Sequence, residues 1–198
     1  MKNIVLLILM SLILSSCFMG SSLLFTESEI LDNPNLVMNP GFDAYSFAGH
    51  DALKGWTIYT KPDDSEFDKI KIDPMHFTEG DTSLRIDASD RDVVIISDSF
   101  EVRRYGGYYS RIKFKTDSPN PPLTRFRMTT FKGNGKITNR FRKRMKLSKE
   151  WDTAAISAGF LKPGVKFARV SIYIPAFSEG SIWIDDVGCW EVHGFRID

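Results

Sequence analysis

Short stretches in which apolar and polar residues alternate recur along this chain of 198 residues, and they constrain its fold more than any other feature. The clearest runs from Tyr108 to Lys115, where even positions hold Tyr, Ser, Ile and Phe and odd positions hold Tyr, Arg, Lys and Lys. A period of two places successive side chains on opposite faces of a β-strand. Turn residues separate further predicted strands at 83–86, 93–100, 124–131, 136–147, 153–160, 167–174, 181–187 and 188–193. Strands at roughly ten-residue spacing predict an all-β sandwich of two antiparallel sheets.

One segment permits a second interpretation. Residues 139–149 are rich in Arg and Lys, which are good helix formers, so a helix is an alternative there. The preceding Gly133-Asn134-Gly135 is a strong hairpin signal and favours a returning strand.

The first residues have the pattern of a targeting signal. Lys2 precedes an apolar stretch, Ile4 to Leu14, that is too short for a comfortable membrane span. Small residues before Cys17 resemble a bacterial lipoprotein cleavage site, which implies lipidation of Cys17; the alternative is an ordinary secretory signal with a chance Cys. We expect a signal peptide at 1–16, a tether at 17–34 and one domain at 35–198. The expected location is extracytoplasmic, in the bacterial cell envelope, lipid-anchored to the outer membrane or cell surface.

Charge is distributed unevenly although the net charge is only +1. Acids dominate from Asp43 to Glu101, whereas Asp117 is the one acid between Val102 and Lys149. Such asymmetry bears on partners rather than on fold. Cys189, among apolar neighbours, is expected to be a buried small side chain.

Several motifs in a fixed order carry a family resemblance. They are Asn39-Pro40-Gly41-Phe42-Asp43, then Gly55-Trp56, the segment 80–86, the strand from Tyr108, then Trp151, and finally 182–187. This order resembles the carbohydrate-binding modules grouped with family 4 and its relatives, the CenC-type group. The resemblance implies a galactose-binding-like jelly roll in which 35–43 and 181–188 are the first and last strands. Trp56 and Trp151 are expected in the core.

The resemblance also implies a structural calcium ion that ties the first strand to the last. The matching positions are Asp43, the loop with Glu79 and Asp81, and Asp185 with its neighbour Asp186. Ca²⁺ takes several oxygen ligands at once from carboxylates and carbonyls. The alternative is a set of solvated acids beside a turn.

Strand parity predicts which side chains face outward. Tyr108, Ile112, Phe126, Met128, Val170 and Ile172 are expected inward, and the outward set is Tyr109, Arg111, Lys113, Arg125, Arg127, Arg169, Tyr173 and Trp183. Aromatic rings stack on sugars and Arg pairs with carboxylate or sulfate, so a common surface of this kind would bind an anionic glycan: a uronic-acid polysaccharide, a sulfated glycan or lipopolysaccharide. The alternative is an ordinary solvated face, with Arg140 to Lys146 a basic edge strand or a surface near anionic lipid.

The sequence offers little for catalysis. We find no distinctive carboxylate pair and no nucleophile elbow, and the three His residues stand apart, so we expect a non-enzyme. A polysaccharide lyase with Tyr109 or Tyr173 as base beside Arg127 is one alternative. A surface or envelope protein with a protein partner is another, and no nucleic acid partner is expected.

Overall fold

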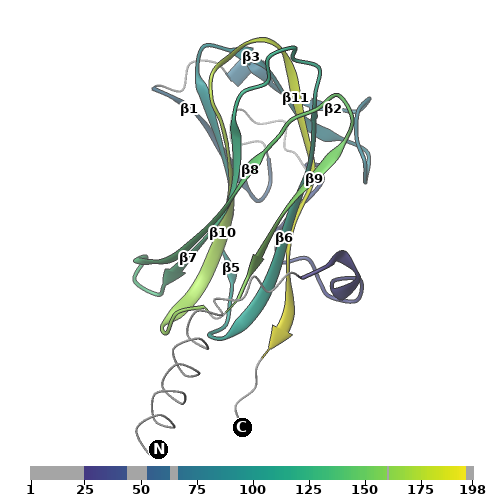
Figure 1. Ribbon diagram of the computed structural model, residues 1–198. Helices are drawn as coiled ribbons and strands as arrows, with labels where there is room; N and C mark the ends of the chain where they lie inside the picture. Colours follow the sequence, from purple (N-terminus) through teal and green to yellow (C-terminus); the bar gives the residue numbers. More distant parts are fainter. Residues whose placement is uncertain (1–24, 44–52, 63–66, 160, 195–198) are drawn as a thin grey trace, which may run out of the picture.

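A computed structural model describes residues 25–43, 53–62, 67–159 and 161–194, and it confirms an all-β jelly-roll sandwich of two antiparallel sheets (Figure 1). The first sheet has the order β1 (Trp56–Lys61), β4 (Asp92–Ser97), β10 (Val165–Ile174), β7 (Thr124–Lys132) and β8 (Ile137–Met145), with β5 (Phe100–Glu101) also paired to β10. The second sheet has the order β2 (Ile70–Asp73), β3 (Ser83–Ser89), β11 (Phe177–Gly194), β6 (Gly106–Thr116) and β9 (Asp152–Ala158). Two 3₁₀ turns, Glu27–Glu29 and Phe67–Lys69, accompany the strands.

The basic segment after the Gly133-Asn134-Gly135 turn is a strand, as the turn predicts. It forms β8, which pairs with β7 at the edge of the first sheet. The two strands predicted at 181–187 and 188–193 are one long strand, β11, interrupted by a bulge between Asp185 and Gly188. Among the described residues, no helix is long and apolar enough to cross a membrane.

The ends of the domain meet as expected, but residues 35–43 are not a strand. Leu36 N–H donates to the Cys189 carbonyl at 2.8 Å, and Val187 N–H donates to the Pro40 carbonyl at 3.0 Å. Between these contacts Asn39 and Phe42 have positive φ, and Pro40 has no N–H to donate. A regular ladder is therefore impossible there, and a bent segment borders β11.

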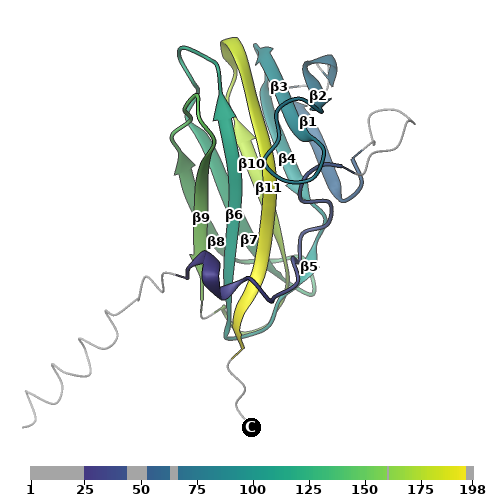
Figure 2. The same ribbon diagram turned by 90° about the vertical axis from the view of Figure 1, so that its right-hand side faces the viewer.

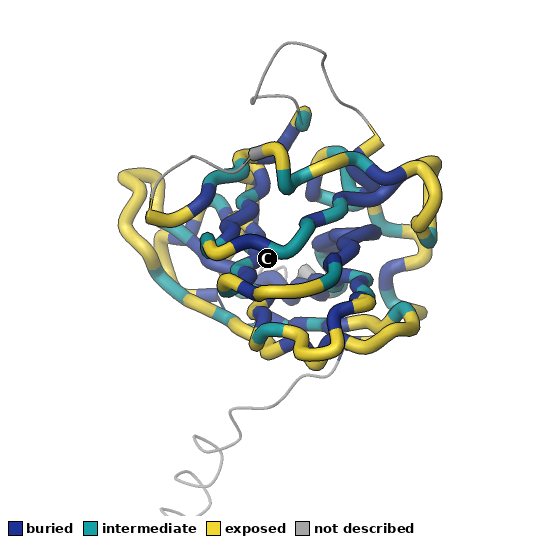
Figure 3. Tube along the Cα trace, turned by 90° about the horizontal axis from the view of Figure 1, so that it is seen from above, coloured by how far each residue is buried: buried dark blue, intermediate teal, exposed yellow. Residues whose placement is uncertain are grey.

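The core lies between the two sheets, where buried residues gather (Figure 3). All six side chains predicted to face inward are fully buried: Tyr108, Ile112, Phe126, Met128, Val170 and Ile172. Trp56 also joins the core and packs on the Phe42 ring at 5.0 Å, and Cys189 is buried there. The expectation for Trp151 is wrong: it precedes β9, stays half-buried and lies under the Lys115 ammonium rather than in the core.

Part of the expected tether packs on the domain. Phe25 and Ile30 form a second apolar cluster with Tyr109 and Trp190 on the outer face of the second sheet, where Figure 2 shows the segment lying across β6 and β11. The Phe25 N–H donates to Ser157 Oγ at 3.1 Å. Both apolar clusters of the described residues lie between Phe25 and Val192, so a chain that begins at Phe18 keeps all of their members.

This packing predicts a role for Phe25 in stability. Phe25→Ala should lower the free energy of unfolding by about 2 kcal/mol, because it removes a buried ring from the second cluster. Leu31→Ala is the matched control, since Leu31 is 80% exposed in the same segment and should change stability by less than about 0.5 kcal/mol. Urea unfolding measures both. Wild-type stability in Phe25→Ala would show that this segment is a tether after all.

Candidate functional site

The eight residues predicted to share one outward surface divide between two faces. Arg125 and Arg127 on β7 and Arg169 and Tyr173 on β10 belong to the first sheet. Tyr109, Arg111 and Lys113 on β6 and Trp183 on β11 belong to the second sheet, on the other side of the sandwich. Parity predicts the outward direction correctly, but sheet membership depends on strand pairing, and the predicted common surface is wrong.

On the second face, the three predicted residues of β6 already make contacts with other side chains of the protein. Tyr109 is 5% exposed and packs with Trp190 and the N-terminal segment. Arg111 pairs with Asp186 at 2.7 Å and with Glu27 at 3.2 Å. Lys113 pairs with the same Asp186 oxygen at 3.1 Å. These cations are therefore neutralised within the protein.

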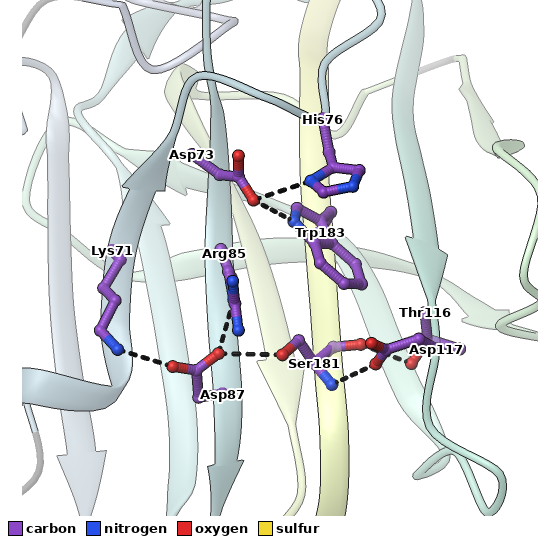
Figure 4. A network of polar contacts seen from close by, with 9 residues as sticks. All are labelled: Lys71, Asp73, His76, Arg85, Asp87, Thr116, Asp117, Ser181 and Trp183. Atoms are coloured by element: carbon purple, nitrogen blue, oxygen red, sulfur yellow. Dashed lines mark hydrogen bonds and ion pairs between the residues drawn. The ribbon is translucent and has the colours of Figure 1, made fainter.

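Trp183 is held in a polar network rather than presented to solvent (Figure 4). Its indole N–H donates to Asp73 at 2.7 Å, and the His76 ring lies 5.0 Å from the indole. The Lys115 ammonium and the Arg85 guanidinium lie over the ring at 5.0 and 5.5 Å. With 5% exposure, the ring offers no free face for a ligand.

The rest of that network joins neighbouring strands of the second sheet. Asp87 accepts hydrogen bonds from Lys71 on β2, from Arg85 on its own strand β3 and from Ser181 on β11. Asp117, which follows β6, accepts from the Ser181 N–H at 2.6 Å. Figure 4 shows these links running across β2, β3, β11 and β6, so this face is tied together by its own polar groups.

The outer face of the first sheet, in contrast, holds an open groove. Its volume is about 380 Å³, and it is lined by Tyr59, Lys61, Val94, Ile96, Arg125, Arg127, Ser171 and Tyr173. The strand register arranges these residues in two rows across the sheet. One row is Tyr59, Val94, Tyr173, Arg125 and Arg144, and the next is Thr57, Ile96, Ser171, Arg127 and Arg142. Three of the eight predicted residues, Arg125, Arg127 and Tyr173, therefore meet in one place.

Neighbouring groups fix the Tyr173 ring. Its hydroxyl donates to the Asp92 carboxylate, and the Arg125 guanidinium lies 5.3 Å from the ring centre. The hydrogen bond to Asp92, together with burial, raises the pKa of the Tyr173 phenol. Tyr59, two strands away, carries the Lys61 ammonium at 5.7 Å. Both rings are half-buried, so each keeps an accessible part.

Arginines without acidic partners surround this groove. The register places Arg140, Arg142 and Arg144 of β8 on the same side of the sheet as Arg125 and Arg127. Within the described part of the chain, no ion pair involves these five residues or Arg169. Sequence reasoning missed Tyr59 and Lys61, although the alternation in 56–61 is the usual strand signal, and treated the β8 arginines as an ordinary edge.

The acids expected to bind calcium are satisfied by hydrogen-bond donors. Asp43 Oδ1 accepts from the backbone N–H groups of Asp81 and Thr82 at 3.0 and 3.1 Å. Asp185 Oδ2 accepts from Thr78 N–H at 2.5 Å and from its hydroxyl at 2.7 Å. Glu79 and Asp81 themselves are exposed. Within the described ranges no group of three or more His, Cys, Asp or Glu side chains is arranged to hold a metal ion.

The loop of residues 78–82 thus links Asp43, near the beginning of the domain, to Asp185 on the last strand. The expected calcium ion would link the same two regions, but here the links are hydrogen bonds from N–H and O–H groups. Oxygens that face donors are poor ligands for Ca²⁺, which requires six to eight oxygens around it. The contacts do not support calcium, and calcium binding at Asp43, Glu79, Asp81 and Asp185 stays a prediction of the sequence.

A thermal melt decides between the two arrangements. The hydrogen-bonded loops predict the same melting temperature in CaCl₂ and in EDTA, because no bound ion contributes to stability. A melting temperature that rises with calcium concentration and falls with EDTA would restore the calcium hypothesis. MgCl₂ at equal ionic strength is the control for general salt effects.

The Asp73 contact predicts a loss of stability in acid. Burial alone would raise the pKa of the Asp73 carboxyl, but hydrogen bonds from Trp183, Met75 and His76 outweigh it and lower the pKa to about 2. The carboxylate therefore stabilises the fold above its unfolded pKa of 3.8, and this contribution is lost as pH falls from about 4 to about 2.

Urea unfolding between pH 6 and pH 2 measures the effect. The wild type should lose about 2 kcal/mol more than Asp73→Asn across the window from pH 4 to pH 2, because Asn does not titrate. Asp81→Asn, at an exposed position, is the control and should follow the wild type. Identical pH curves for wild type and Asp73→Asn would contradict the prediction.

Sequence comparison leaves the family open: no protein-family model matches this chain, and no curated protein matches it. Comparison of structures is informative. A family 61 carbohydrate-binding module, solved in complex with β-1,4-galactotriose, matches with a TM-score of 0.58 and 13% identity over 80% of this chain and 99% of that one. A family 16 carbohydrate-binding module matches with a TM-score of 0.55 and 11% identity over 79% of this chain and 100% of that one.

A larger protein contains the same fold as one part. The enzymatically active domain of tailspike protein 4 from bacteriophage CBA120 matches with a TM-score of 0.61 and 13% identity, over 79% of this chain and 21% of that one. At these identities the likeness concerns the fold. Over about four-fifths of its length, the chain has the jelly-roll fold of carbohydrate-binding modules.

Proposed function

We propose that this protein binds carbohydrate without catalysis, at the groove on the outer face of the first sheet. One observation carries the proposal: two Tyr rings line the same open groove as two arginines that form no ion pair with any described acid. The fold shared with the family 61 and family 16 modules supports it. The family 4 grouping and the place of the protein in the cell envelope, with Cys17 as a lipidated anchor outside the described residues, belong to the same proposal.

The row through Tyr59 and Tyr173 suits a sugar chain that crosses the strands. Neighbouring strands lie about 4.8 Å apart, so side chains separated by one strand are roughly 10 Å apart. Tyr59 on β1 and Tyr173 on β10 have this separation, with the apolar Val94 between them. Rings at this spacing contact sugar units about two residues apart, through the apolar C–H faces of the sugars.

The charged end of the same row specifies the kind of glycan. Beyond Tyr173 the row continues with Arg125 and Arg144, and the next row continues with Arg127 and Arg142. Guanidinium groups bind carboxylate and sulfate in pairs of parallel hydrogen bonds. We therefore assign the ligand to the anionic glycans, with uncharged sugar faces over the tyrosines and acidic groups over β7 and β8.

The groove lacks the features that catalysis would need. Among the described residues, its lining includes no His and no pair of carboxylates, and glycoside hydrolysis requires such a pair. The raised pKa of Tyr173 opposes its use as the base of a lyase. Tyr109, the other base considered, lies on the opposite sheet from Arg127 and is covered by the N-terminal segment.

Binding measurements with two ligand types test the proposal. Tyr173→Ala should weaken binding of polygalacturonate about fivefold to thirtyfold by titration calorimetry or affinity electrophoresis, because a stacking ring contributes roughly 1–2 kcal/mol. Arg127→Ala should weaken binding of the anionic ligands polygalacturonate and dextran sulfate. If the wild type also binds a neutral galactan, the affinity for that galactan should stay the same in Arg127→Ala. Tyr105→Ala removes a Tyr outside the groove and is the control.

The melting temperature of each variant must be measured alongside its glycan affinity. One further variant, on the second sheet, tests whether the glycan site lies on the first sheet or on the second. Trp183→Ala should lower the melting temperature, since it removes the indole hydrogen bond to Asp73, yet leave glycan affinity unchanged at a temperature where the variant is folded. Loss of affinity in folded Trp183→Ala with full affinity in Tyr173→Ala would move the site to the second sheet. Absence of binding to every anionic and neutral glycan would leave a protein partner as the better explanation.

A further inference from the structure

One end of the sandwich carries exposed cations that the groove does not use. We call it the basic end, defined by Arg103, Arg104, Lys132, Lys136, Lys162 and Lys166, all of which are exposed. They come from three connections: the turn before β6, the β7–β8 hairpin and the segment that leads into β10 (Figure 1). Contacts hold these connections together, because Val102 N–H donates to the Lys166 carbonyl and Val165 pairs with Lys132 in the sheet.

Few acids balance these charges. Among the described residues, the carboxylates on the strand ends and connections beside these cations are Asp98, Glu101 and Glu191, and Glu191 lies 3.7 Å from the Arg103 guanidinium. Glu27 and Glu29 follow in the N-terminal segment, where Glu27 pairs with Arg111. The opposite end carries acids, namely Asp90, Asp117, Glu150 and Glu179, beside Arg91, Lys146 and Lys149. Glu79 and Asp81 belong to neither end, because the β2–β3 connection lies beside Asp185 in the middle of β11. The two ends of the sandwich therefore differ in charge along the direction of the strands.

The N-terminal segment leaves the domain at the basic end. The Phe25 ring lies against Gly107, the second residue of β6, and its N–H donates to Ser157 near the end of β9. Cys17 is eight residues before Phe25, and a fully extended chain spans at most about 3.6 Å per residue, so this connection reaches roughly 29 Å. An apolar leader or lipid attached there keeps this end close to the membrane that holds it.

The surface of the basic end also has a shape that suits phospholipid headgroups. A hollow of about 700 Å³ is lined by Arg103, Arg104, Lys166 and Phe167, together with Glu101. Beside it, the Arg104 guanidinium lies 4.3 Å from the ring centre of Tyr105. Tyr residues are enriched at the interface between membrane and water, where the ring is in the headgroup region and the hydroxyl is hydrated.

We propose that the basic end docks on the surface of an anionic phospholipid bilayer. Each Lys or Arg near such a surface strengthens binding by roughly fivefold, and the attraction extends over about one Debye length of 8 Å. The docking therefore needs the basic end itself to touch the headgroups, and it does not depend on the glycan groove, which opens on the side of the sandwich.

Vesicle sedimentation tests this with the chain from Phe18 to Asp198, which keeps both apolar clusters and lacks the leader. The wild type should bind vesicles of phosphatidylcholine with 30% phosphatidylglycerol at low salt, bind pure phosphatidylcholine far less, and dissociate as salt rises. The variant Arg104→Gln/Lys162→Gln/Lys166→Gln should lose on the order of 100-fold in affinity.

A control variant that loses the same number of positive charges elsewhere shows whether vesicle binding depends on the basic end or only on net charge. Arg140→Gln/Arg142→Gln/Arg144→Gln neutralises three cations of β8 and should retain vesicle binding within about threefold, while it weakens polygalacturonate binding. Lys132→Gln/Lys136→Gln is a second basic-end variant, confined to the hairpin, and should lose at least tenfold. Circular dichroism and thermal melts confirm folding of each variant.

Three results would overturn the proposal. Equal losses in the basic-end and β8 variants would show attraction by net charge alone. A loss confined to the β8 variant would make the first-sheet face the membrane surface. Absence of wild-type binding to anionic vesicles would exclude docking, and because glycan binding is measured separately, each result leaves the groove proposal to its own test.

Discussion

The bulge in β11 at Asp185 and Asp186 determines how charge is distributed over the molecule. Asp185 is fully buried and points to the N–H groups of Thr78 and Glu79, whereas Asp186, at a positive φ of 46°, points to Arg111 and Lys113. In a regular strand Asp186 would point to the same side as Ile184, into the core, and the bulge lets it face these cations instead. Gly188 completes the bulge, since a Cβ there would lie 2.0 Å from the Trp190 ring.

This arrangement explains why the two faces of the sandwich differ. Asp186 pairs with Arg111 and Lys113 of β6, and Asp87 pairs with Lys71 of β2 and Arg85 of β3. The second face is thus closed by its own ion pairs and by the N-terminal segment. On the first face Asp92 accepts from the Tyr173 hydroxyl, and no ion pair among the described residues involves the arginines of β7, β8 and β10. Uncompensated cations are costly unless solvent or a ligand balances them, and an open face provides access to both.

The sequence predicts those properties that depend on neighbouring residues. Period-two alternation is local, so the inward direction of Ile112, Phe126 and Ile172 follows from it directly. Sheet membership is not local: β6 and β7 are consecutive along the chain yet lie in different sheets, because β6 pairs with β11 and β7 with β10. For that reason the predicted surface is split, and only part of it, around Tyr173 and Arg127, becomes a groove.

The exposure of aromatic residues also depends on contacts that the local sequence does not predict. Trp183 has the correct parity for an outward ring, but its exposure is set by Asp73, His76 and Lys115, which come from distant parts of the chain. Trp151 fails in the opposite sense, since a large apolar side chain suggests the core but its position just before β9 leaves it at the surface under Lys115. Residue type predicts a tendency to be buried, and the partners that cover a ring are decided by topology.

The geometry of the two proposed surfaces fixes how they would work together. The rows of the groove run across the strands, and the basic end is where strands begin and end, so the rows lie roughly parallel to any membrane on which that end rests. A glycan along the row through Tyr59, Tyr173 and Arg125 would then lie alongside the membrane rather than point toward it. Anionic lipid and anionic glycan would bind separate sets of cations, so neither would compete with the other for the same arginines.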